Sequence, residues 1–301
     1  MTAPGVAVVI GGVNVDVLAV PAAPLVVGVS NPGRVRIAAG GAGRNVAENL
    51  ARLGVLTRLI ASADAHPLTN LAITQAARAG VDTSGVLRIH GRGNYYVAIE
   101  YAGAIHSAVS DMAAAEALTA SDLDARASLV EDATAVIVDA NLQPATITRA
   151  VELAGGKLLC LLPVSAAKAG RIRPVLPRAA LIVAGAPEMA ALTGLDVGSP
   201  EQALRAARAL RPDGGTVLVT MGAEGLGWVG AEEIWVEPPP AAVRDPTGAG
   251  DAAAAAAIYA LATEMDARRG ARLAMAAAVM TLEVEGANHP GLSPEALHAR
   301  V

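Results

Sequence analysis

Short apolar runs rich in β-branched residues alternate along this chain with longer stretches of helical periodicity, and this alternation narrows the possible folds. The predicted strands are residues 6–10, 135–139, 158–162, 181–184 and 217–221. The predicted helices are residues 45–53, 71–79, 121–132 with Ser121 as its cap, 144–154, 187–192 and 200–210. Strands that alternate with helices predict an α/β fold, with a central, mostly parallel sheet inside a three-layer α/β/α domain.

One region departs from this rhythm. Residues 34–38, 95–101 and 105–110 have strand character without the alternating helices, and residues 101–104 suit a hairpin turn between the last two strands. We therefore expect a small, mostly antiparallel sheet that is appended to the main α/β body.

Composition excludes several classes of protein. The 301 residues carry 23 Lys+Arg and 28 Asp+Glu, so the formal net charge of −5 argues against nucleic-acid binding. The longest alanine run, residues 252–257, is too short to span a bilayer. Asn14 and Asp16 interrupt the apolar N-terminal stretch, which argues against a secretory signal. The lone Cys160 excludes an internal disulfide. A cytoplasmic enzyme without membrane or nucleic-acid partners is expected.

The stretch from Asp245 to Asp251 reads Asp-Pro-Thr-Gly-Ala-Gly-Asp and precedes a helix predicted over residues 252–261. Glycines before a helix let backbone N–H groups converge, and the helix dipole adds partial positive charge, so this loop can hold an anion such as phosphate. A carboxylate at the same place can accept a proton from an attacking hydroxyl. The alternative is a tight turn in which Asp251 only caps the helix.

Two further stretches carry candidate ligand-binding residues. In Ala-Gly-Gly-Ala-Gly-Arg-Asn, residues 39–45, a dinucleotide fingerprint fails because Val46 stands where its third glycine is needed. Asn45 lies in the first turn of the following helix, where it could bind a sugar hydroxyl or only cap the helix. Asn14 and Asp16 alternate on one strand face and could chelate neighbouring hydroxyls, unless that face is simply exposed.

Together these stretches resemble the PfkB/ribokinase family of sugar and nucleoside kinases over essentially the whole chain. Residues 40–45 match the N-terminal glycine motif of that family, and residues 245–251 match its C-terminal motif. The resemblance implies one ribokinase-like kinase domain over residues 1–301. The small sheet would then be a lid over the sugar site, with strands from about 13–38 and 92–111.

Within that family the chain is most similar to the pseudouridine kinases, in residues 30–35, 43–50, 110–112, 139–142 and 163–168. This similarity implies ATP-dependent phosphorylation of the 5′-hydroxyl of pseudouridine, which gives pseudouridine 5′-phosphate. Mg²⁺ is expected with ATP, and a monovalent cation is a further expectation. A homodimer through the lid would cover an exposed sheet edge.

The resemblance also implies roles for individual residues. Asp251 would be the catalytic base, beside charge-stabilising N–H groups of Gly248, Ala249 and Gly250. The substrate would be bound by Asn14, Asp16, Gly41 and Asn45, with Asp111 and Asn141 as further candidates. The nucleotide would contact Thr220, Gly222, Gly225 and Asn288. Glu188 would act indirectly on the metal.

Several positions depart from the family pattern. Asp64, Ala65 and His66 stand where Gly-Asp-Asp is common, and Thr69 replaces a glycine. Gly185 replaces the Asn of Asn-x-x-Glu, and Leu162 replaces an Asp before Pro-Val-Ser. Two alternatives therefore stay open: a kinase for another nucleoside or ribose-type sugar, and a weakened ligand-binding protein on the same fold. A dinucleotide-dependent oxidoreductase is disfavoured by Val46 and by Asp251 after its glycines.

Overall fold

The computed structural model describes residues 5–101 and 104–301, which form a large sheet covered by helices and a smaller second sheet. The large sheet has the strand order β14-β13-β12-β11-β10-β9-β1-β4-β5, with β6 paired to β4. Its parallel strands are β1 (Val6–Ile10), β4 (Leu56–Ala63), β5 (Val81–Asp82), β6 (Val86–Arg88), β9 (Ala133–Asp139), β10 (Leu158–Leu162), β11 (Leu181–Gly185) and β12 (Thr216–Thr220). The hairpin of β13 (Leu226–Val229) and β14 (Glu233–Val236) adds an antiparallel edge.

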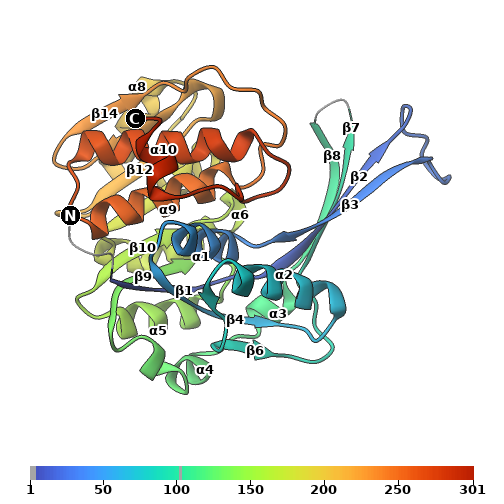
Figure 1. The fold of residues 1–301 in the computed structure, drawn as a ribbon, viewed down its shortest axis with the longest axis horizontal. Helices are drawn as coiled ribbons and strands as arrows, with labels where there is room; N and C mark the ends of the chain where they lie inside the picture. The colour runs from blue at the N-terminus through green and yellow to red at the C-terminus, as the bar shows by residue number, and fades with distance from the viewer. Residues whose placement is uncertain (1–4, 102–103) are drawn as a thin grey trace.

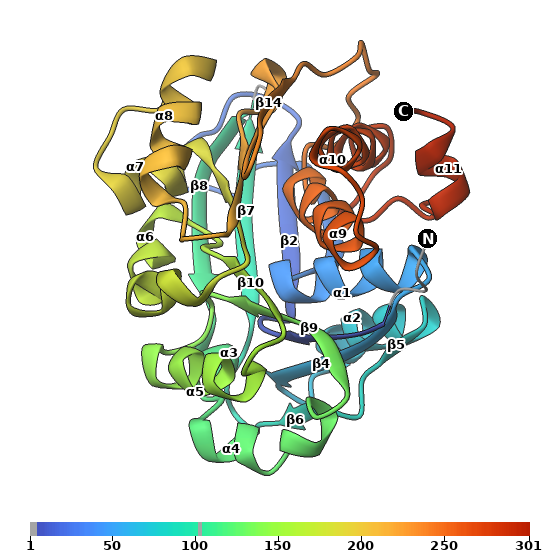
Figure 2. The ribbon, with the colours of Figure 1, turned by 90° about the vertical axis from the view of Figure 1, so that its left-hand side faces the viewer.

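Helices cover both faces of this sheet, which confirms the predicted three-layer arrangement (Figures 1 and 2). One face is covered by α1 (Ala42–Arg52), α2 (Pro67–Arg78), α9 (Ala249–Ala262), α10 (Ala267–Leu282) and α11 (Pro294–His298). The other face is covered by α3 (Ala113–Glu116), α4 (Ala120–Asp124), α5 (Pro144–Ala154), α6 (Ala166–Ala169), α7 (Ala186–Thr193) and α8 (Pro200–Leu210). In the described part of the chain, no helix combines the length and the apolar character needed to cross a membrane.

The core is built largely from small aliphatic side chains, because the sequence contains no phenylalanine. Helix α9 shows this most clearly, since residues 252–257 are consecutive alanines and all are buried. A helix that is apolar all round is suited to the interior. Alanine on every side lets α9 pack closely between the large sheet, α1 and α10, and so fixes the position of its first turn.

The second sheet projects from the body (Figure 1) and has the strand order β3-β2-β7-β8. Its strands are β2 (Asn14–Pro21), β3 (Gly33–Gly40), β7 (Tyr95–Tyr101) and β8 (Ala104–Asp111). Pairs β2–β3 and β7–β8 are antiparallel, and β2–β7 is parallel. The mostly antiparallel sheet is therefore confirmed, although residues 102–103 of the predicted hairpin turn lie outside the described residues.

One predicted helix is shorter than expected. Residues 121–132 were expected to form a single helix capped by Ser121, but α4 ends at Asp124 and a separate 3₁₀ turn covers Ala127–Leu129. The cap is Thr119, whose hydroxyl accepts from the backbone N–H of Asp122 while the Asp122 carboxylate accepts from the Thr119 N–H. This reciprocal capping box places the cap two residues before Ser121, so that α4 begins at Ala120. Two further 3₁₀ segments are Gly170–Arg178 and Gly222–Glu224.

Candidate active site

The first turn of α9 combines an open helix N-terminus with a carboxylate. Its cap residue, Gly248, has φ +80°, and a Cβ there would lie 2.1 Å from the carbonyl oxygen of Ala287, so only glycine fits. A Cβ on Gly250 would meet nothing within 4 Å, which leaves space above the turn. The first N–H groups of a helix have no partner within it, so those of Ala249 and Gly250 are available to an anion.

Asp251 lies in this turn, and α1 holds its carboxylate in place. The side-chain amide of Asn45 donates to Asp251 Oδ2 at 2.7 Å, which joins two residues 206 positions apart. Burial raises the pKa of Asp251 to about 7, although the hydrogen bond from Asn45 and the charge of Arg44 oppose the rise. A carboxylate with this pKa is partly ionised near neutral pH, as a general base for a hydroxyl requires.

The loop before α9 is fixed by Asp245, the first residue of the 245–251 motif, for which the sequence predicted no role of its own. Its carboxylate accepts from the backbone N–H groups of Thr247 and Gly286, both at 2.9 Å. Arg36 of β3 pairs with it at 2.6 Å. Burial would raise the pKa of Asp245, but the contacts with Thr247, Gly286 and Arg36 outweigh it and hold the pKa at about 2. Asp245 is therefore an ionised anchor for this loop.

Asp139 anchors the second glycine-led turn, and sequence reasoning did not single it out. Its Oδ2 accepts from the backbone N–H groups of Gly12, at 2.8 Å, and Gly43, at 2.9 Å. It thereby joins the ends of β1 and β9 to the start of α1. A Cβ on Gly11 would lie 2.4 Å from this carboxylate. The sequence signal was an Asp at the end of a buried strand, beside a glycine pair on the neighbouring strand.

The predicted sugar-binding pair lies where the second sheet meets the body. Asn14 and Asp16 share one face of β2, and the Asn14 amide donates to the Asp16 carboxylate. Burial raises the pKa of Asp16 to about 6, against the lowering effect of the charges of Arg44 and Arg36. A Cβ on Gly40 would lie 2.4 Å from Asp16 Oδ1. The glycine motif is needed here to make room for the carboxylate.

Gly41 is fixed by its backbone. It has φ +100°, and a Cβ would lie 2.4 Å from the carbonyl oxygen of Gly12. Gly41 therefore allows α1 to begin directly against the end of β1, which brings Asn45 to Asp251.

The two further substrate candidates differ in their surroundings. Asn141 is buried, and its Oδ1 accepts from Lys168 Nζ at 2.6 Å. Its backbone N–H donates to Asp139. Asp111 is exposed at the end of β8, pairs in register with Tyr95, and accepts from the Ala113 N–H. Asn141 thus belongs to the Asp139 network, whereas Asp111 lies at the outer strand of the second sheet.

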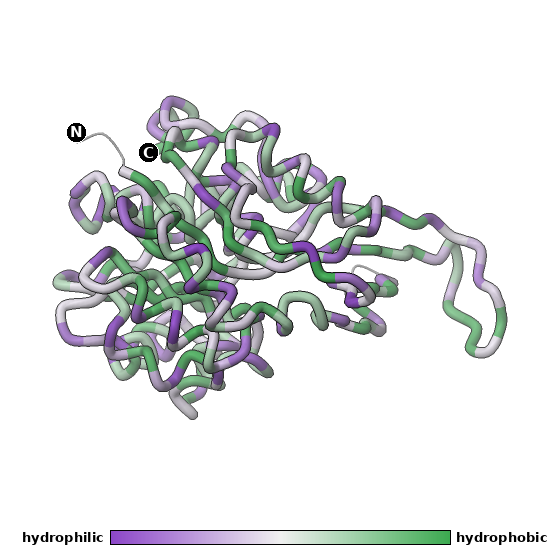
Figure 3. Tube along the Cα trace, turned by 90° about the horizontal axis from the view of Figure 1, so that it is seen from below, coloured by the Kyte–Doolittle hydropathy of each residue, from purple (hydrophilic) through white to green (hydrophobic). Residues whose placement is uncertain are grey.

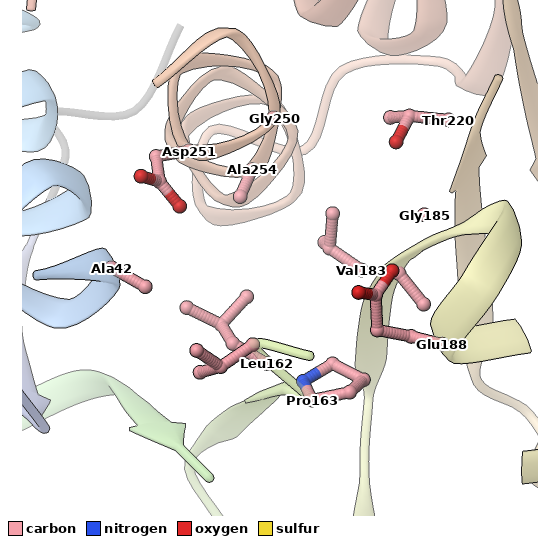
Figure 4. A pocket seen from close by; sticks show the side chains of 12 residues that line it. Ala42, Leu162, Pro163, Val183, Gly185, Glu188, Thr220, Gly250, Asp251 and Ala254 are labelled. Carbon is pink, nitrogen blue, oxygen red and sulfur yellow. The ribbon is translucent and has the colours of Figure 1, made fainter. Parts of the chain in front are cut away.

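A cavity of about 200 Å³ opens in front of Asp251 (Figure 4). The carboxylates of Asp251 and Glu188 face it from opposite sides, and Leu162 lies between them. A Cβ on Gly185 would lie 2.7 Å from Glu188 Oε2. An Asn at position 185 would therefore compete with Glu188 for space, so the loss of that Asn leaves the carboxylate free to take its present position.

A second cavity, of about 240 Å³, shares Thr220 and Gly250 with the first. Gly222 and Gly225 also line it, so three of the four predicted nucleotide contacts lie together, among apolar side chains that include Leu226, Met275 and Val279. An apolar cavity that shares Gly250 with a cavity carrying two carboxylates at a helix N-terminus suits a flat ring attached to phosphates.

Asn288 does not line this second cavity. Its amide instead accepts from Arg44 at 2.7 Å and donates to the Asn45 carbonyl at 2.9 Å. The structure thus places Asn288 against α1, and its predicted contact with the nucleotide stays a prediction. The turn-rich sequence after α10 gave no sign that the chain returns to α1 at this point.

The donor set of the first cavity is compatible with magnesium. Within residues 5–101 and 104–301, no group of three His, Cys, Asp or Glu side chains could hold a metal ion unaided. Magnesium usually keeps several waters and binds to one or two carboxylates together with substrate phosphates. Glu188 and Asp251, on opposite sides of the cavity, fit that need.

Comparison with known proteins agrees with this geometry. The model for the family described as pfkB family carbohydrate kinase matches residues 6–294. Pseudouridine kinase of Escherichia coli (strain K12) is 27% identical over 291 residues, which cover 95% of this chain and 93% of that protein. Guanosine-inosine kinase of Exiguobacterium acetylicum is 29% identical over 306 residues, 97% of this chain and 98% of that protein.

Solved structures give the same result. A carbohydrate kinase from Agrobacterium tumefaciens matches with a TM-score of 0.83 and 29% identity, covering 98% of this chain and 96% of that one. The expected ribokinase-like fold is confirmed. Since the family model matches nearly the whole length, this chain belongs to the pfkB family of carbohydrate kinases.

Proposed function

We propose that this family member is an ATP-dependent kinase that phosphorylates the 5′-hydroxyl of pseudouridine. The observation that carries the proposed transfer to a hydroxyl is Asp251, held by Asn45 at the open N-terminus of α9, with a pKa of about 7. The choice of pseudouridine is supported by the similarity to the pseudouridine kinase of Escherichia coli. In the proposed reaction Asp251 accepts the hydroxyl proton, and the hydroxyl oxygen bonds to the γ-phosphorus. The bond from that phosphorus to the β–γ bridging oxygen breaks, and ADP leaves.

The turn of Gly248, Ala249 and Gly250 supports the transfer step. Its N–H groups and the dipole of α9 are directed where negative charge collects on the transferring phosphoryl group. Such donors stabilise the transition state more than the ground state, which is the condition for raising kcat.

We assign the ribose to the space beside Asn14, Asp16, Gly41 and Asn45. The two side chains of β2 provide hydroxyl-binding groups, and Asn45 joins this group to the base through its contact with Asp251. Asn141 is assigned to the substrate side through the Asp139 network, and Asp111 stays a weaker candidate because it is exposed on the outer strand. In this proposal the second sheet is the lid.

ATP is assigned to the apolar cavity with its phosphates directed toward Gly250, which lines both cavities. Mg²⁺ would supply positive charge to the phosphate oxygens, with Glu188 on the protein side of its water shell. A monovalent cation stays a prediction that no feature of the cavities tests.

The positions at which this sequence departs from the family pattern favour one further candidate, a ligand-binding protein with weak or no turnover. Leu162 presents an apolar side chain to the cavity where the family has a carboxylate. Loss of a charged group beside the phosphates would weaken metal binding while leaving the base in place.

The experiment that tests the proposal measures ADP release with MgATP and pseudouridine, uridine, guanosine, adenosine or ribose as acceptor. Turnover on pseudouridine above all others supports the proposal, with a rate that rises as the pH increases through about 7 and Asp251 ionises. Turnover on another acceptor keeps the reaction and changes the substrate. Binding without turnover on any acceptor, measured by calorimetry, selects the ligand-binding protein.

The homodimer through the second sheet also stays a prediction. The face opposite Asn14 and Asp16 carries one cross-strand row, Ile37, Val17, Val97 and Val109. Ile37, Val97 and Val109 are 47%, 44% and 71% exposed, and Figure 3 shows apolar segments along this projecting sheet. A Val97→Glu variant should lower the molar mass measured by light scattering if a second copy covers this row.

A further inference from the structure

The ion pair between Arg36 and Asp245 joins the second sheet to the loop that opens α9. Arg36 lies on β3, and its guanidinium is 2.6 Å from Asp245 Oδ2. The Asp245 side chain is only 5% exposed, whereas that of Arg36 is 36% exposed. Within the described residues this is the one ion pair between a strand of the second sheet and the 245–251 motif.

Asp245 transmits any force on this pair to the anion-binding turn. The same carboxylate accepts from the N–H groups of Thr247 and Gly286. Gly248 follows Thr247, and Ala287 follows Gly286. These two residues already touch so closely that Gly248 has no room for a Cβ. A displacement of Asp245 therefore moves both sides of the contact that sets the start of α9.

Arg36 also faces the substrate side of the second sheet. The register pairs Asp16 with Ala38 and Leu18 with Arg36, so Arg36 and Asp16 share one face. Arg36 acts on both carboxylates, since its charge lowers the pKa of Asp16 and its hydrogen bond lowers that of Asp245. One cation thus lies between the proposed sugar-binding residue and the proposed anion-binding loop.

We propose that Arg36 is a positioning residue for phosphoryl transfer, which fastens the second sheet to the 245–248 loop and so sets the first turn of α9 when the sheet is seated. This role rests on the proposed kinase function for its effect on rate, but the mechanical coupling does not. Substrate that seats Asp16 and the rest of β2 would thereby also align the N–H groups of α9. Arg36 touches neither substrate nor phosphate in this proposal.

The chain provides a matched control. Arg34 lies two residues away on the same face of β3, is exposed, and makes no ion pair with any described residue. Arg34→Ala removes the same charge and the same side chain from the same strand. Arg36→Lys keeps the charge of Arg36 but offers one point contact in place of a planar fork.

The first measurement is hydrogen exchange of the backbone amides in residues 244–252, without ligands. Arg36→Ala should exchange faster there than the wild type, Arg36→Lys should be intermediate, and Arg34→Ala should match the wild type. This readout needs no turnover, so it decides the coupling even if the acceptor panel finds no kinase activity. Equal exchange in Arg36→Ala and Arg34→Ala would overturn the proposal.

The second measurement is kinetic, on the acceptor that the panel identifies. Misplacement of a reacting geometry by about 1 Å costs on the order of 10²-fold, so Arg36→Ala should lower kcat by about that factor with a smaller change in the acceptor KM. Asp245→Asn should act through the same contact. The double variant should then lose no more than the larger single loss.

Chemical rescue separates positioning from general destabilisation. Guanidinium at millimolar concentration should restore part of the kcat of Arg36→Ala, because it can replace the missing cation beside Asp245. It should restore none in Asp251→Asn, which lacks the base. Independent, multiplicative losses in the double variant, or a normal kcat in Arg36→Ala, would overturn the positioning role.

Discussion

Two helices of this protein begin with nearly the same glycine-rich pattern and use it differently. At the start of α1, the N–H of Gly43 is bound by the protein's own Asp139, and the N–H of Arg44 donates to the Gly12 carbonyl. At the start of α9, the space in front of Gly250 is open and lined by Asp251. A glycine-led helix start is thus an anion site only where no internal carboxylate has already filled it.

The comparison explains why the two turns depend on each other. The buried carboxylate at α1 fixes that helix to β1 and β9, and α1 then offers Asn45 to Asp251. The turn at α1 positions Asn45, and the turn at α9 provides Asp251 for the proposed chemistry. Substitutions in the two turns should therefore separate stability from turnover.

The largest expected effect is that of Asp251→Asn. Asn keeps an oxygen for the hydrogen bond from Asn45 but cannot accept the proton, so kcat should fall by about 10²–10⁴-fold. Nucleotide affinity, measured by calorimetry, should stay within a few-fold of the wild type. A variant with wild-type kcat would remove Asp251 from the role of base.

Gly248→Ala should be the next largest. The alanine would need φ +80° and would place its Cβ 2.1 Å from the Ala287 oxygen, so the α9 turn must shift. Strain of this kind costs on the order of 1–3 kcal/mol of folding stability, and turnover should fall as well. Gly250→Ala is the control, because its Cβ meets nothing within 4 Å. Equal thermal unfolding temperatures for the two variants would contradict this reading of the turn.

Asp139→Asn should mainly lower stability. The amide cannot accept on both sides, so it leaves a buried backbone N–H without a partner, at a cost of about 1–3 kcal/mol. Chemical denaturation should show this loss, while the pH dependence of any remaining turnover stays that of Asp251. Unchanged stability would mean that the α1 turn is not held by its internal carboxylate.

The remaining expected effect is a change of stability with pH. The pKa of Asp251 is raised from 3.8 to about 7, so the folded protein binds this proton more tightly than the unfolded chain does. The wild type therefore loses stability from this group as the pH rises from about 4 to about 7. The Asn of Asp251→Asn does not titrate, so this variant does not lose that stability. At pH 8 it should therefore unfold at a higher temperature than the wild type.

Asp245 should show the opposite dependence of stability on pH, because its pKa is lowered to about 2. Its stabilising contribution is present above pH 4 and is lost as the pH falls toward 2. Asp245→Asn should therefore be less stable than the wild type at pH 8, opposite to Asp251→Asn. The same direction of change in both variants would contradict the charge environments described for the two turns.

The sequence predicted the layers of the fold well, because the strands of a covered parallel sheet are short apolar runs. Asp251 and Asn45 could also be singled out, since each lies beside glycines at a helix start. Their contact could not, because it joins residues 206 positions apart. Asp139 and Arg36 were missed for the same reason. Their roles come from strand order and register, which neither the Asp at the end of β9 nor the Arg in the middle of β3 reveals by itself.

The alternating sides of β2 have a consequence for how this sequence can vary. Asn14 and Asp16 face the proposed substrate, while Val15 and Val17 belong to the opposite face. Inserting or deleting a single residue within β2 would exchange these two sets, since side chains along a strand change sides at every step. Within the β2–β3 hairpin we therefore expect changes of length to be tolerated in the turn at residues 22–32, whereas the strands at its base must keep their number of residues.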